Sequence, residues 1–126
     1  MKLLTVNDVE IIHMMIVDAS GGSHWVRDRE RLCGIVEQLE QSVFGVDLCP
    51  TIFFKSAALM FGIINYHPLV DGNKRTGMIC ALELLNLNGI DTKNFQDQEI
   101  EDYAVKVAVD NLDVKDIANW LKIHCK

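Results

Sequence analysis

Two apolar segments of helical length, separated by a short polar turn, constrain the fold of this chain more than any other feature. The first covers residues 52–64 and the second covers residues 78–87. Within the first segment only Lys55 and Ser56 are polar. A helix that is apolar around nearly its whole circumference is buried rather than exposed on the surface. The two segments therefore predict a helical hairpin at the centre of the protein.

The rest of the chain reads as further helices. Apolar residues recur at helical spacing over residues 8–18, 28–42, 97–109 and 113–124, and the central pair extends to residues 51–66 and 73–88, capped by Gly89. Asn7 and Glu10 have the spacing of a capping box for the first helix, and residues 45–50 read as a loop. No alternating strand pattern of useful length is present. A chain of 126 residues with this pattern predicts one all-α domain over residues 1–126, with five to seven helices.

Composition and charge argue against several classes of function. The net charge is −6, which argues against a nucleic-acid partner because nucleic-acid-binding domains usually carry a basic face. No segment offers about 18 consecutive apolar residues, and the first residues contain no apolar run of signal-peptide length, so we expect no membrane span. The four cysteines are spaced too irregularly for a metal site or a redox pair. These features predict a cytoplasmic protein with reduced thiols.

Two single residues outside the hairpin allow more than one interpretation. His13 shares a helix face with Val9 and Ile16, so we expect a packed histidine, with a functional one as the alternative. Residues 19–26 break the helix with two glycines and include an aromatic side chain, Trp25. On such a loop Trp25 can either pack into the core or offer a contact surface, and the residues alone leave both interpretations open.

The polar turn between the two apolar segments is rich in reactive and charged groups. It reads His-Pro-Leu-Val-Asp-Gly-Asn-Lys-Arg-Thr-Gly over residues 67–77, whereas a turn that only reverses the chain needs Gly, Pro or Asn and little else. The following helix begins inside the turn, so its first backbone N–H groups lack intrahelical partners and carry the positive end of the helix dipole. Together with Gly72, Lys74 and Arg75, this arrangement predicts an anion site suited to phosphate.

Asp71 and His67 add the groups that a phosphate-transfer reaction needs. A carboxylate at the mouth of an anion site is unfavourable unless it holds a divalent cation, and Mg²⁺ commonly binds through one or two carboxylates and substrate phosphates. His67 lies four residues earlier and is of a residue type that serves as a base near neutral pH. The pair suggests a hydroxyl group that is deprotonated and attacks phosphorus. The alternative reads each residue separately, with Asp71 as a helix cap and His67 as a cation at a helix end.

These residues resemble the loop of the Fic/Doc superfamily, which reads His-x-Phe-x-(Asp/Glu)-(Gly/Ala)-Asn-(Gly/Lys)-Arg. Residues 26–28, 55–58 and 86–90 are similar to its Doc, or death-on-curing, branch, and the resemblance covers about residues 5–95. It implies an all-α Fic/Doc-like fold. It also implies an enzyme that transfers part of a nucleoside triphosphate, such as ATP, to a hydroxyl group of a target protein.

The resemblance implies a role for each polar residue of the loop. His67 would be the catalytic base and Asp71 the Mg²⁺ ligand. The phosphate cradle would be formed by Gly72, Asn73, Lys74 and Arg75. The loop that contains Trp25 falls where the family has its target-docking flap, which favours Trp25 as a contact for the target. A small antitoxin is implied as a possible partner, because the sequence contains no Ser/Thr-x-x-x-Glu-(Gly/Asn) inhibitory segment.

Three positions depart from the pattern of the adenylylating Fic enzymes. Leu69 replaces the usual Phe and can still anchor the loop in the core, with less buried area. Lys74 stands where those enzymes have Gly, and Met78 stands where they have a second Arg. The Lys form is similar to Doc, which favours transfer of the γ-phosphoryl group to a translation factor such as elongation factor Tu. AMP transfer is the alternative, followed by a non-catalytic binding module and a purely structural helical protein.

Overall fold

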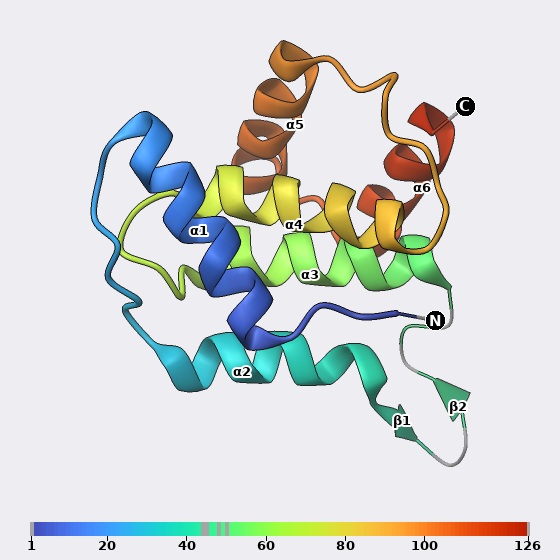
Figure 1. Ribbon diagram of the computed structural model, residues 1–126. Helices are drawn as coiled ribbons and strands as arrows, with labels where there is room; N and C mark the ends of the chain where they lie inside the picture. The colour runs from blue at the N-terminus through green and yellow to red at the C-terminus, as the bar shows by residue number, and fades with distance from the viewer. Residues whose placement is uncertain (1, 44–45, 48, 50, 126) are drawn as a thin grey trace.

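The computed structural model describes residues 2–43, 46–47, 49 and 51–125, and these are mostly helical (Figure 1). In chain order the α-helices are α1 (Val6–Ser20), α2 (Arg29–Glu37), α3 (Ile52–Tyr66), α4 (Asn73–Leu87), α5 (Asp97–Val109) and α6 (Val114–His124). The predicted all-α class is confirmed, and the helices found in the described part of the chain fall within the expected number. Residues 45, 48 and 50 of the predicted loop lie outside the described residues.

The predicted helical hairpin, α3 and α4, forms the centre of the molecule. Figure 1 shows the two helices side by side, with α2 on one side, α5 and α6 on the other, and α1 lying across the hairpin. Most residues of both helices are buried. One cluster of apolar side chains packs the hairpin against α5 and α6, and a second packs it against α1 and α2. The two helices therefore hold the turn between them, residues 67–72, in a rigid frame.

Local caps determine where several helices begin and end. Thr51 accepts a hydrogen bond from the Phe54 N–H at the start of α3, as expected. Gly89 has a φ of 82° and follows α4, where the Ile90 N–H donates to the Leu85 carbonyl at 3.0 Å. A left-handed glycine after the last helical turn is the usual way to end a helix, so the predicted end of α4 is confirmed.

The start of α1 differs from the prediction. The capping box is formed by Thr5 and Asp8, whose side chains each accept a hydrogen bond from the other residue's backbone N–H. The prediction had placed this box at Asn7 and Glu10, because their spacing also fits the motif. Thr5 is preferred because Leu4 before it and Val9 after it belong to the same buried cluster, which is the apolar contact that often accompanies a capping box.

The end of α2 also differs from the prediction, which continued the helix to residue 42. The α-helix ends at Glu37 and is followed by the 3-10 turn η1 (Gln38–Glu40) and the strands β1 (Ser42–Val43) and β2 (Val46–Asp47), which pair antiparallel. The buried Lys55 of α3 donates a hydrogen bond to the Leu39 carbonyl. A buried ammonium group needs an acceptor, and here the acceptor is a carbonyl of η1.

The cysteines are reduced, and no membrane-spanning helix is found among the described residues. All four cysteines are free thiols. Cys80 is fully buried in α4, and burial raises the pKa of its thiol, with a smaller contribution from Glu83 and Asp8. It therefore behaves as the small hydrophobic residue that was expected. Among the described residues, no helix combines the length and the apolar character that crossing a membrane requires.

Candidate active site

The turn between α3 and α4 is fastened to the segment that precedes α2. The Pro68 carbonyl accepts hydrogen bonds from the N–H groups of Arg27 (2.8 Å) and Asp28 (3.0 Å), and the Val70 N–H donates to the Trp25 carbonyl at 3.1 Å. These bonds place the two segments edge to edge, as a short antiparallel bridge. The loop that carries Trp25 therefore lies directly beside the turn that carries His67 and Asp71.

Trp25 itself does not pack into the core. Its side chain is 77% exposed, while its main chain is held by the bridge to the turn. An exposed aromatic residue on a held loop is available for contact with a partner. The structure thus excludes the packed interpretation of Trp25, and its use as a contact surface for a target stays a prediction.

Two buried hydrogen bonds between the Asn73 side chain and the Leu69 main chain hold the loop together. The Asn73 side chain accepts a hydrogen bond from the Leu69 N–H (3.0 Å) and donates one to the Leu69 carbonyl (2.9 Å). Leu69 is fully buried, so it anchors the loop as expected for the residue at this position. Because its amide group is already paired in both directions, Asn73 holds the loop in shape with its side chain.

His67 ends α3 in a left-handed conformation, with φ 48° and ψ 55°. A left-handed backbone is uncommon for residues other than glycine, and asparagine, aspartate and histidine adopt it more often than the rest. Such a conformation turns the chain sharply out of the helix, and it leaves the His67 side chain exposed on the wall of a cleft. The carbonyl of the preceding residue, Tyr66, is capped by the Arg31 guanidinium at 3.0 Å.

Asp71 is held at two points by the N-terminal part of the chain. Its carbonyl oxygen lies 2.8 Å from Nε2 of His13, and its Oδ2 accepts a hydrogen bond from the Ser23 N–H at 2.8 Å. Gly22 has a φ of 110° and lies so close that a Cβ atom there would be 3.2 Å from the Asp71 Cβ. The expected packed histidine is confirmed, since His13 is 1% exposed.

The start of α4 is the one that the sequence analysis predicted to bind an anion. Its N-cap is Gly72, which has a φ of 80° and no side chain to accept from the first turn. By contrast, α1, α2, α3 and α6 each begin with a Thr or Asp side chain that accepts such a hydrogen bond. The first N–H groups of α4 therefore have no side-chain cap and can donate to an anion.

All residues predicted for the loop chemistry line one cleft of about 540 Å³. These are His67, Asp71, Gly72, Asn73, Lys74 and Arg75. Arg27 lines the cleft from the opposite segment, a residue that the sequence analysis did not select. Its signal in the sequence was the similarity of residues 26–28 to the Doc branch, which gave Arg27 no role, because the bridge that brings it to the cleft is a tertiary contact.

The charges in this cleft favour an anionic ligand, although the protein as a whole is acidic. Arg27, Lys74 and Arg75 outnumber the carboxylate of Asp71. The Arg75 guanidinium also forms an ion pair with Glu101 of α5 at 2.7 Å, and both side chains are about half exposed. A solvent-exposed pair of this kind is weak, so Arg75 can exchange Glu101 for a phosphate group.

A single carboxylate limits which metal the cleft can hold. Among the residues that the structure describes, no three His, Cys, Asp or Glu side chains form a metal-binding cluster. Zinc sites use three or four such ligands, whereas Mg²⁺ is often held by one or two carboxylates, water and substrate phosphates. Asp71 beside an anion site fits the second description.

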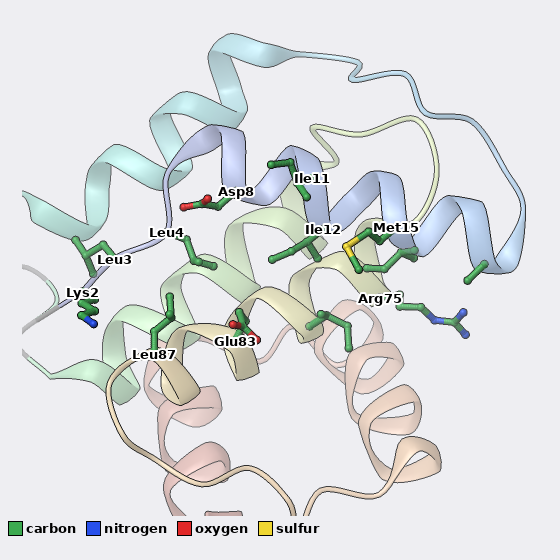
Figure 2. A pocket seen from close by; sticks show the side chains of 13 residues that line it. Lys2, Leu3, Leu4, Asp8, Ile11, Ile12, Met15, Arg75, Glu83 and Leu87 are labelled. Carbon is green, nitrogen blue, oxygen red and sulfur yellow. The ribbon is translucent and has the colours of Figure 1, made fainter.

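A second and larger hollow, which we call the α1–α4 groove, adjoins this cleft. It has a volume of about 980 Å³ and shares Ile16 and Arg75 with the cleft. Figure 2 shows side chains from α1 and α4 facing each other across it, with Lys2 at one end and Arg75 at the other. Its apolar residues include Ile11 and Met15, which are 56% and 65% exposed.

Comparison with known proteins gives two matches. The model of the Fic/DOC family matches residues 3–85, a range that contains the cleft residues, the Trp25 loop and most of α4. The protein named Toxin Doc from Mycolicibacterium smegmatis is 38% identical over 101 residues, which cover 79% of this chain and 78% of that protein.

Proposed function

Because this chain is a Doc-like member of the Fic/Doc family, we propose that it acts as a toxin that transfers the γ-phosphoryl group of a nucleoside triphosphate to a protein hydroxyl group. The observation that carries the proposal is that one cleft gathers His67, Asp71 and the uncapped start of α4. An imidazole, a carboxylate and an anion site are the parts that phosphoryl transfer to a hydroxyl group requires.

In this proposal His67 is the general base. It takes the proton of the target's hydroxyl group, whose oxygen then attacks the γ-phosphorus and displaces the nucleoside diphosphate. General base catalysis of this kind contributes on the order of 10²–10⁴ in rate. The exposed position of His67 on the cleft wall supports this role, because the base must reach a group that arrives with another protein.

The phosphate groups of the nucleotide are held by the start of α4. The N–H groups of its first turn, together with Lys74 and Arg75, donate to phosphate oxygens, and Arg27 adds charge from the opposite wall. Asp71 is the ligand for Mg²⁺, which neutralises part of the phosphate charge when it is bound. The hydrogen bond from Ser23 to Asp71 orients the carboxylate in advance.

The choice of phosphoryl over AMP transfer is supported by Met78. The adenylylating pattern has an arginine at this position. Met78 carries no charge and is completely buried, so it cannot contact a nucleotide as that arginine would. Lys74 instead lines the cleft one turn earlier. AMP transfer remains the second candidate because it uses the same base and the same cradle.

A direct experiment separates the candidates. The protein is incubated with elongation factor Tu, Mg²⁺ and ATP, and the intact mass of the target is measured. We expect a gain of one phosphate group and transfer of label from the γ-phosphate. A gain of one AMP, with label from the α-phosphate, would establish AMP transfer instead. No change on any protein of a cell extract, with no nucleotide binding by calorimetry, would leave only a binding module.

The partner that controls this toxin is proposed to be a small antitoxin. The α1–α4 groove suits an amphipathic helix of that partner, because it is largely apolar and carries a cation at each end, Lys2 and Arg75. The groove opens into the active cleft at Ile16 and Arg75. A segment bound there would compete with a nucleotide for Arg75, which explains how a bound partner could inhibit transfer.

Replacing Met15 with glutamate is expected to weaken this complex by about 10-fold or more, because a charge would be buried in an apolar contact. The measurement is titration calorimetry with a candidate antitoxin that co-purifies with the unaltered protein. Met14→Glu is the matched control, since Met14 is 51% exposed on the same helix but does not line the groove. Equal affinity of both variants for the partner would contradict this location.

A further inference from the structure

The buried His13 makes a contact that packing alone does not require. Its side chain is 1% exposed, and its Nε2 lies 2.8 Å from the main-chain carbonyl oxygen of Asp71. A carbonyl oxygen can only accept, so the proton of this hydrogen bond belongs to Nε2. The residue lies on α1, 58 positions before Asp71 in the sequence, and it thus joins α1 to the start of α4.

The peptide that receives this hydrogen bond joins Asp71 to Gly72, and the glycine allows this peptide to reverse its direction. Gly72 has φ 80° and ψ 19°, values that are typical of the third residue of a type II turn. Glycine adopts the negative φ of the related type I turn with about equal ease. The two turns differ mainly by a flip of the preceding peptide, here the one between Asp71 and Gly72.

A flip of this peptide would change the chemistry of the cleft. In a trans peptide the C=O and N–H groups point in opposite directions. With the carbonyl directed at His13 on α1, the Gly72 N–H is directed away from His13, on the side opposite to that carbonyl. Gly72 lines the cleft and is the N-cap of the helix where phosphate is proposed to bind, so reversal would exchange the positions of a donor and a partly negative oxygen beside that site.

We propose that His13 is a positioning residue for the phosphate cradle. Its Nε2–H selects the orientation of the Asp71–Gly72 peptide that offers a donor, rather than an acceptor, to a nucleotide. The Ser23 N–H holds only the Asp71 carboxylate, so it cannot replace this contact. The role in nucleotide binding rests on the proposed function, whereas the orientation of the peptide is a property of the free protein.

The test compares His13→Phe, which keeps an aromatic ring but no donor, with His13→Gln, whose amide nitrogen has nearly the reach of Nε2. Nuclear magnetic resonance on the free proteins reports the peptide directly, because the contact between the Asp71 Hα and the Gly72 amide proton is short in a type II turn and long in a type I turn. We expect a strong signal in the original protein and in His13→Gln, and a weaker one in His13→Phe.

The second readout is the affinity for ATP in the presence of Mg²⁺, measured by calorimetry. It is measured at a temperature at which the original protein and both variants are folded. We expect His13→Phe to lose roughly 10-fold in affinity and His13→Gln to stay within about threefold of the original protein. An unchanged Asp71–Gly72 signal in His13→Phe would overturn the proposal. So would a weak signal in the original protein, a result that does not depend on whether a variant folds. If the signal shifts as expected but the original protein binds no nucleotide, the positioning of the peptide stands and the proposed function falls.

Discussion

Replacing His67 with asparagine is expected to reduce the transfer rate by about 10²- to 10⁴-fold, the contribution of a general base. Asparagine is chosen because it tolerates the left-handed backbone that His67 adopts (φ 48°). Alanine would add backbone strain to the loss of the base. Since His67 is exposed and lies at the end of α3, the variant should keep the fold and bind nucleotide with nearly the original affinity.

The measurement is the initial rate of target modification at saturating nucleotide, with nucleotide affinity determined separately by calorimetry. His24→Asn is the matched control. This second exposed histidine is paired with Asp18 at 2.6 Å, and it does not line the cleft. A His67→Asn protein that keeps more than about a tenth of the original rate would be incompatible with a general base at this position.

Replacing Asp71 with asparagine is expected to remove the Mg²⁺-dependent part of nucleotide binding and, with it, transfer. Asparagine keeps an oxygen that can accept from the Ser23 N–H, so the loop conformation should survive. What disappears is the negative charge, and we expect the apparent affinity for Mg²⁺ in the presence of ATP to fall by at least about 10- to 100-fold.

This prediction is checked by titrating Mg²⁺ into the ATP-bound protein and into its variant. Asp110→Asn serves as the control, because Asp110 is exposed at the end of α5, away from the cleft. Unchanged Mg²⁺ dependence in Asp71→Asn would show that the carboxylate serves only the loop. Its role would then be to accept the hydrogen bond from the Ser23 N–H, not to cap α4, whose N-cap is Gly72, and the transfer mechanism would have to be given up.

Several features of the fold follow from local sequence and were therefore predictable. The hairpin of α3 and α4 follows from two apolar segments, and both helices start and end close to the predicted residues because Thr51 and Gly89 act on their immediate neighbours. The start of α1 was predicted incorrectly because two overlapping capping motifs compete within six residues. A choice between such motifs depends on which flanking apolar residues become buried, here Leu4 and Val9, and burial is a property of the whole fold.

The end of α2 illustrates the opposite case. Residues 38–42 continue a helical pattern, yet the α-helix stops at Glu37 and gives way to η1, where the Leu39 carbonyl accepts a hydrogen bond from the buried Lys55 of α3. The acceptor and donor lie 16 residues apart. Periodicity describes neighbours along one helix, so it cannot report a requirement that arises in another.

In the reactive loop, too, some features follow from the local sequence and others depend on tertiary contacts. By itself the sequence determined that His67, Asp71 and the start of α4 lie within one short turn, because residues this near in sequence cannot be far apart in space. It did not determine that Asn73 uses its side chain to close the loop, that Arg75 pairs with Glu101, or that Arg27 reaches the cleft. Nor did it show that the main chain of Asp71 is held by His13. The Asn73 contact is local and depends on the conformation that the turn adopts. The other contacts join separate segments, and only the packing of the chain around the hairpin brings those segments together.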